Sequence, residues 1–314
     1  MTKLLMRLYR PAMTPRYRIG LSAYDMDAVE FTELAVAAEQ CGFDTLWLGE
    51  HIIAPESGGG VHPTTADQPV HHLGSVVDST VRLIDPLTTL AAAAARTSRI
   101  FLATGIYLLP LRHPLATARI ASTVQDLARG RFLLGVGAGW LQEEFDALGV
   151  EFRTRFGRFE ESIAVLREAW AGGWFSRCGT HYSFGRVQVV AEPVAIPLVL
   201  GGNSGPALRR AARLGDAWLS SGTLDYENAA RLRDAVEAAC AAVGRTEPLR
   251  CWFRIERLDP ALIDRFTAEG MTDLVVWADQ LWRGPDLDAR RAALAEAASH
   301  VGLGLQVRAD TGTP

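Results

Sequence analysis

Short apolar segments alternate with amphipathic helical segments along most of this chain, and the alternation constrains the fold more than any other feature. Strands that are separated by a helix must pair in parallel. Eight such units predict an α/β fold, a closed (β/α)8 TIM barrel, with an open doubly wound sheet as the alternative. No GxGxxG motif follows the first strand, which weighs against the open sheet. The predicted strands are 18–24, 45–48, 100–109, 131–137, 196–200, 216–220, 249–256 and 273–278.

Two segments interrupt this alternation. Residues 52–84 contain a GGG run, several prolines and almost no helical period, so we expect either a long loop over a functional site or a plain insertion. The histidines of this loop have no second ligand cluster beside them, and no metal site is predicted. Residues 174–192 alternate in the manner of a small antiparallel hairpin. We therefore expect one domain over residues 1–314 with these two insertions.

Bulk composition excludes several classes of protein. The chain has 314 residues, of which 48% are hydrophobic and 22% charged, with a formal net charge of −4. No basic surface of the kind that binds nucleic acid is implied. The four cysteines form no CxxC pair, which suits a reducing compartment. No signal peptide and no apolar run of membrane-spanning length is present in the sequence, so we expect a cytoplasmic protein without a membrane partner.

The fourth predicted strand, RFLLGVG, runs into a glycine-rich turn and an acidic segment that ends at residue 144. Gly135, Gly137 and Gly139 interrupt an apolar run that otherwise suits a strand covered on both faces. Glycine costs conformational entropy in a strand and offers no side chain for packing. The pattern therefore predicts either a flat or bulky ligand against the end of this strand, or a bulge or tight turn without a ligand.

A second glycine-rich segment, GGNSGP, follows the fifth predicted strand and opens a helix. Successive backbone N–H groups and a helix N-terminus together favour a phosphate group there. An ordinary turn in which Ser204 caps the helix is the alternative. A cluster of three arginines, Arg153, Arg155 and Arg158, lies in a partly helical segment, and we expect it to form a solvated face with local glutamate partners.

The predicted strand ends carry small and polar residues. In a (β/α)8 barrel the chemistry takes place at the carboxyl ends of the strands, which meet at one mouth. A site is therefore expected where these ends converge. They hold Tyr24, Glu50, His51, Thr104, Gly105, Ile106, Gly137, Ala138, Gly139, Trp140, Gly201, Gly202, Asn203, Ser204, Ser220, Ser221, Arg254 and Trp277.

Over about residues 18–300 the chain resembles the luciferase-like monooxygenase superfamily and, within it, the coenzyme F420-dependent (deazaflavin) oxidoreductases. The resemblance rests on FDTLWLGEH, DPLTTLAAAAARTSRIFLATGIYLLPLRHP, GRFLLGVGAGW followed by Glu143-Glu144-Phe145, PLVLGGNS and LGDAW, in that order. It implies a (β/α)8 barrel of the bacterial luciferase type with insertions, and a deazaflavin or flavin bound at the barrel mouth.

The resemblance also implies roles for individual residues. The cofactor phosphate is expected at the loop 201–204, and the ring system is expected beside the third strand and the glycines of the fourth. A non-prolyl cis peptide is expected between Gly105 and Ile106. Some deazaflavin relatives carry a carboxylate where this chain has Trp140, so a second proton-transfer group is not assigned. The implied cofactor-binding residues are Thr104, Gly105, Ile106, Gly137, Ala138, Gly139, Gly201, Gly202, Asn203 and Ser204.

The resemblance predicts an oxidoreductase that transfers a hydride between coenzyme F420 and a small organic substrate. His51 is the candidate for the accompanying proton, because histidines titrate near neutrality, or it only hydrogen-bonds the cofactor. Glu50 either orients His51 or faces the barrel wall. An FMN-dependent monooxygenase that uses reduced flavin and O2 is the alternative, and a non-catalytic cofactor-binding barrel is a third reading. Tyr24, Trp140 and Trp277 are expected to form an apolar substrate pocket, and a homodimer accords with the resemblance.

Overall fold

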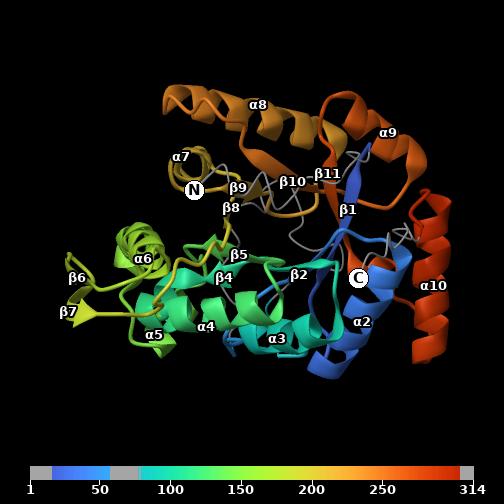
Figure 1. The fold of residues 1–314 in the computed structure, drawn as a ribbon. Coiled ribbons are helices and arrows are strands. Elements are labelled where there is room, and N and C mark those ends of the chain that lie inside the picture. The colour runs from blue at the N-terminus through green and yellow to red at the C-terminus, as the bar shows by residue number, and fades with distance from the viewer. Residues whose placement is uncertain (1–15, 57–76, 78, 305–314) are drawn as a thin grey trace, which may run out of the picture.

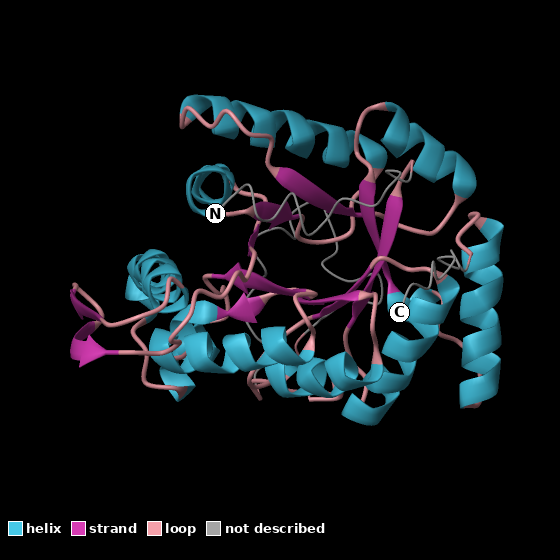
Figure 2. Ribbon diagram, in the orientation of Figure 1, coloured by secondary structure: helices cyan, strands magenta, loops and turns pink. Residues whose placement is uncertain are grey.

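The structure, a computed structural model, describes residues 16–56, 77 and 79–304. Parallel strands close into a barrel with helices around it (Figures 1 and 2), which confirms the predicted (β/α)8 fold. The sheet runs in the order β3, β2, β1, β11, β10, β9, β8, β5, and pairing of β3 with β5 closes it. The barrel strands are β1 (Arg18–Ala23), β2 (Thr45–Leu48), β3 (Phe101–Thr104) with its continuation β4 (Tyr107–Leu108), β5 (Phe132–Gly137), β8 (Leu198–Gly201), β9 (Ala217–Leu219), β10 (Arg250–Arg254) and β11 (Asp273–Trp277).

The third barrel strand is bulged between β3 and β4. Both halves pair with β5, through Ala103 with Leu133 and through Tyr107 with Val136. Four steps along the third strand (103 to 107) therefore oppose three steps along β5 (133 to 136), which inserts one extra residue. The peptide bond between Gly105 and Ile106, in the middle of this bulge, is cis as the resemblance implied.

The glycines of β5 make room for this bulge. A Cβ on Gly135 would lie 1.9 Å from the Thr104 carbonyl oxygen, and one on Gly137 would lie 1.9 Å from Ile106 Cδ1. The bulge lies in the third strand and not in the glycine-rich strand itself, and the two interpretations of that strand stay predictions. Atoms of the bulged third strand occupy the space that the missing side chains leave beside Gly135 and Gly137.

Most of the helices begin next to a residue whose side chain can cap a helix N-terminus. Asp27, Asp85, Asp225, Asp259 and Asp286 each accept a hydrogen bond from a backbone N–H of the first turn, as helix N-caps do. The helices are α2 (Ala28–Cys41), α3 (Pro86–Arg96), α4 (Pro114–Leu127), α5 (Gln142–Ala147), α6 (Arg155–Trp170), α7 (Gly205–Leu214), α8 (Tyr226–Ala242), α9 (Pro260–Ala268) and α10 (Leu287–His300), with short 3-10 turns at Leu109–Leu111, Phe152–Thr154 and Ala278–Gln280.

Most of the buried side chains form two layers, as alternation along barrel strands requires. One layer fills the barrel interior, where the Trp47 and Trp252 rings meet edge to face with centroids 5.2 Å apart. The larger layer lies between the strands and the surrounding helices. At the amino end of the strands, Asp273 accepts hydrogen bonds from Arg18 and Arg250, each with a shortest N···O distance of 2.6 Å. Burial alone would raise the pKa of Asp273, but these two cations lower it.

The structure describes one of the two predicted insertions in full and the other only in part. Strands β6 (Phe175–Cys178) and β7 (Ser183–Val187) form an antiparallel hairpin outside the barrel sheet, seen beside α6 in Figure 1. Most of the predicted loop 52–84 lies outside the described residues, which leave out 57–76 and 78.

The packing of β5 against the bulge gives a test of the fold. Gly135→Ala should lower the free energy of unfolding by about 3 kcal/mol, because its Cβ would overlap a backbone oxygen that cannot rotate away. Gly185→Ala in β7 is the matched control, since its Cβ would meet no atom within 4 Å, and we expect a change of about 0.5 kcal/mol at most. Chemical denaturation of both variants measures the difference, and equal stabilities would contradict this account of the glycine.

Candidate active site

The carboxyl ends of the strands surround a cavity of about 1170 Å³, large enough for a cofactor together with a small substrate. Residues from both halves of the chain line it. Nearly all of the predicted site residues do so: Tyr24, Glu50, His51, Gly105, Ile106, Gly137, Ala138, Gly139, Trp140, Gly201, Gly202, Asn203, Ser204 and Trp277.

Thr104 is the exception among the predicted site residues. It is fully buried, and its hydroxyl donates to the Gly135 carbonyl oxygen at 2.6 Å. The side chain thus ties β3 to β5 beneath the bulge and does not line the cavity. Ile106, two residues further on, lines the cavity instead. Its side chain lies beside Gly137 and Gly201, and a Cβ added to Gly201 would lie 3.1 Å from it.

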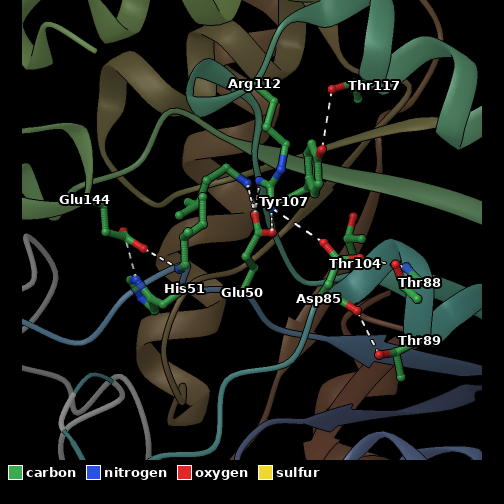
Figure 3. Close-up of polar contacts among 12 residues, drawn as sticks. Glu50, His51, Asp85, Thr88, Thr89, Thr104, Tyr107, Arg112, Thr117 and Glu144 are labelled. Carbon is green, nitrogen blue, oxygen red and sulfur yellow. Dashed lines mark hydrogen bonds and ion pairs between the residues drawn. The ribbon is translucent and has the colours of Figure 1, made fainter. Parts of the chain in front are cut away.

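His51 lies at the end of the segment that follows β2, and its ring is held by Glu144 of α5. The distance from His51 Nδ1 to Glu144 Oε2 is 3.0 Å, and the other carboxylate oxygen accepts the Ile52 N–H at 2.6 Å (Figure 3). Glu144 is fully buried, and His51 is 8% exposed. With Glu144 ionised, its carboxylate only accepts hydrogen bonds, so His51 then carries its proton on Nδ1 and Nε2 is the nitrogen with a lone pair. Nε2 has no hydrogen-bond partner among the described residues.

The neighbouring Glu50 has a different partner. Its carboxylate forms two hydrogen bonds with the Arg112 guanidinium, at 2.6 and 3.1 Å, and accepts the Leu108 N–H at 2.6 Å. Figure 3 shows this ion pair apart from the pair of His51 with Glu144. Burial raises the pKa of Glu50, and the charge of Arg112 opposes that effect. The carboxylate that orients His51 is therefore Glu144, while Glu50 anchors the bulged strand through Leu108 and Arg112.

The loop after β8 leads into the N-terminus of α7. Asn203 bridges to the next loop, accepting the Ser221 N–H and donating to the Ser221 carbonyl, both at 2.8 Å. Ser204 caps α7, its hydroxyl accepting the Ala207 N–H at 3.4 Å. Gly202 has φ +105°, a conformation that side chains rarely adopt. The Ser204 and Gly205 N–H groups donate to no described residue, so the loop presents free donors at the positive end of a helix.

Two arginines extend this positive region. Arg155 and Arg210 both line the cavity, and their guanidinium carbons lie 4.2 and 4.6 Å from the centre of the Phe156 ring. Burial lowers the pKa of each, and their mutual proximity lowers the pKa of Arg155 further. The expectation of a solvated face is therefore wrong for Arg155, which packs on aromatic rings at the cavity wall. The backbone donors of this loop, the helix N-terminus and two cations that form no ion pair with a described residue together fit the phosphate of a large cofactor.

Sequence reasoning did not identify Glu144, Arg155 or Arg210 as site residues. Glu144 stood in the recognised GRFLLGVGAGW…EEF segment, but the segment gives no indication that it reaches a histidine 93 positions earlier. Trp140 contacts the same histidine, with ring centroids 5.6 Å apart and an interplanar angle of 82°. His51 is thus enclosed by a carboxylate on one side and an indole on another.

The fold and this mouth define a barrel enzyme with a cofactor-sized cavity. Residues 11–257 match the family described as luciferase-like monooxygenase, so the chain belongs to that family and is an oxidoreductase. It is 29% identical over 254 residues to the uncharacterized protein Rv0940c of Mycobacterium tuberculosis, a match that covers 80% of this chain and 85% of that protein. It is 30% identical over 217 residues to the F420-dependent glucose-6-phosphate dehydrogenase of Nakamurella multipartita, covering 67% of this chain and 58% of that enzyme.

The barrel also superposes on the crystal structure of monooxygenase RslO1 from Streptomyces bottropensis, with a TM-score of 0.66. The sequence identity is 18%, and the match covers 90% of this chain and 98% of that one, which shows the shared fold. In the part of the chain that the structure describes, no helix is long and apolar enough to cross a membrane. Nor do these residues contain a group of three or more histidine, cysteine or acidic side chains placed to hold a metal ion.

The positive end of the cavity gives a second prediction. Arg210→Met should weaken binding of coenzyme F420 or FMN, each of which carries a phosphate, by about tenfold or more, because it removes the guanidinium that would bind the phosphate and keeps the side-chain stem. Arg209→Met is the matched control, since Arg209 is the exposed neighbour on α7 and does not line the cavity. Fluorescence titration measures both, and equal weakening by the two variants would argue against a direct contact.

Proposed function

We propose that the chain transfers a hydride between coenzyme F420 and a small organic substrate, with His51 moving the accompanying proton and Glu144 positioning His51. The observation that carries the proposal is the buried contact between Glu144 and Nδ1 of His51 at the mouth of a cofactor-sized cavity. The family match and the F420-dependent relative support the choice of cofactor.

The residues of the cavity fit a ring-bearing cofactor with a phosphate. Ile106 and the glycines of β5 provide a flat floor, and Ser204, Arg155 and Arg210 provide the anion-binding end. When bound, coenzyme F420 supplies a carbon that exchanges a hydride, two electrons with one proton, with the substrate. The chain itself must place the substrate and manage one further proton, on the substrate oxygen or nitrogen.

His51 is suited to that proton. With Nδ1–H donated to Glu144, the opposite nitrogen Nε2 is free to accept a proton when the substrate is oxidised and to return it when the substrate is reduced. Glu144 also stabilises the imidazolium that forms, because its charge is buried and close. Trp140 packs edge to face on the His51 ring and would limit the access of solvent to it.

A reduced-flavin monooxygenase is the second candidate, and Trp140 is the observation in its favour. Some deazaflavin relatives carry a carboxylate at that position, whereas this chain has an indole that packs on His51. Titration of the purified chain with coenzyme F420 and with FMN, oxidised and reduced, separates the candidates. We expect F420 to bind at least about tenfold more tightly. Tighter binding of FMN would favour the monooxygenase, and binding of neither would remove both.

The roles of His51 and Glu144 can be tested by paired substitutions. His51→Asn should slow hydride transfer by about 10²–10⁴-fold with little change in cofactor affinity, because only proton transfer is removed. Glu144→Gln should cause part of that loss, since an amide NH2 facing Nδ1 favours the opposite tautomer and protonates Nε2. Single-turnover kinetics over a range of pH measures the effect.

Glu143→Gln is the control for this pair, because Glu143 precedes Glu144 in α5, whereas the carboxylate bound to His51 among the described residues is that of Glu144. We expect wild-type rates for that variant. The tautomer itself is a separate readout, since nitrogen NMR of the His51 ring distinguishes a proton on Nδ1 from one on Nε2. A pH–rate profile of His51→Asn that matches the wild type would show that another group carries the proton.

A further inference from the structure

Two arginine side chains are buried among the described residues, Arg131 and Arg254, and they differ in how many hydrogen-bond acceptors the protein gives them. Arg131 donates to the carbonyl oxygens of Ile100 at 2.6 Å and Thr97 at 2.9 Å, and to further acceptors nearby. These acceptors replace the hydrogen bonds to water that the two terminal nitrogens of Arg131 lose on folding, although its Nε is buried without a partner. Arg254, at the end of β10, has fewer acceptors among the described residues.

Arg254 has one hydrogen-bond acceptor for its side chain, the Ser22 hydroxyl, at 3.1 Å from Nη2. Its Nε is buried without a partner, and Nη1 has no acceptor among the described residues. No acidic side chain pairs with it in the described part of the chain. Some partly buried arginines do have carboxylates, as Arg112 has Glu50 and Arg250 has Asp273.

The position of Arg254 indicates where an acceptor for its remaining N–H groups could come from. Its side chain lines the cavity, although it is only 4% exposed. The guanidinium carbon lies 4.3 Å from the centre of the Trp277 ring, so one face of the cation is covered and its edges are left to donate. This end of the cavity is built from β1, β10 and β11, whereas the phosphate end is built from α6 and α7. The cavity thus has two separate cationic ends.

Arg254 remains charged under ordinary conditions. Burial lowers its pKa to about 10, which still leaves the guanidinium protonated at neutral pH. A buried cation without an anion is costly, and such costs persist at sites where a ligand supplies the missing charge. Guanidinium groups are the usual choice for carboxylates and phosphates, because their N–H groups match two acceptor oxygens.

We propose that Arg254 binds an oxyanion of the substrate, so that the chain acts on organic anions, carboxylates or phosphate esters, whose remaining body packs against the aromatic side chains Tyr24, Trp140 and Trp277. The identification of this anion as the substrate rests on the proposed function. The presence of an anion site at Arg254 does not, and it can be measured without turnover.

Three ligands that share a phenyl ring test the proposal: benzoate, phenyl phosphate and neutral benzamide. Calorimetric titration of the full chain, with and without saturating coenzyme F420, should show at least one of the two anions binding about tenfold or more tightly than benzamide. Arg254→Met should reduce that preference to about twofold or less, and Arg254→Lys should retain part of it. Arg209→Met should keep the preference, because Arg209 is exposed on α7 and does not line the cavity.

The stability of Arg254→Met distinguishes a binding role from a structural one. If the guanidinium serves a ligand, removing an uncompensated buried charge should leave the melting temperature equal to or above that of the wild type.

A large fall in melting temperature would assign Arg254 to the fold and overturn the proposal. So would a wild-type chain without anion preference, or a preference that disappears in Arg210→Met but survives in Arg254→Met. Loss of F420 binding in Arg254→Met with the anion preference intact would assign the residue to the cofactor. Failure of F420 to bind the wild type would count against the proposed function alone.

Discussion

The close approach of β5 to the bulged third strand is the constraint on which the rest of the site depends. Backbone atoms of Thr104 and the side chain of Ile106 occupy the volume that side chains at positions 135 and 137 would fill. Because these atoms cannot move independently, the bulge fixes the floor of the cavity and the direction of β4. Glu50 then holds β4 through Leu108 and Arg112, so the polar residues after β2 are positioned relative to the same floor.

Much of the architecture could be predicted from the sequence, because each strand–helix unit carries its own local signals. Apolar runs, aspartate caps and glycine stops set the elements, and parallel pairing over helical connections leaves few closed arrangements. Most predicted boundaries lie within a few residues of those observed, as for the predicted strand 273–278 against β11. The hairpin of β6 and β7 was recognisable for the same reason, since alternation is a local pattern.

The contacts that join distant segments could not be predicted in this way. Glu144 reaches His51 across 93 positions, and nothing in either local sequence specifies that partner. Arg155 looked like part of an exposed basic cluster because Arg210, which shares the Phe156 ring with it, comes near only when α6 and α7 come together in the barrel. Thr104 was assigned to the cavity by its position, but its rotamer is set by the Gly135 carbonyl. Side-chain direction and charge partners are properties of the assembled barrel, and a single sequence does not record them.

The division of the cavity between the two halves of the chain has a consequence for folding. His51, Ile106 and Glu144 come from the first half, whereas Arg210, Arg254 and Trp277 come from the second. A ligand that fills the cavity therefore contacts both halves, and its binding energy resists their separation along the seams of the barrel. Neither half alone carries more than a fragment of the site. The occupied protein is accordingly expected to exchange its amide hydrogens more slowly on both sides of the barrel at once, as a single cooperative unit.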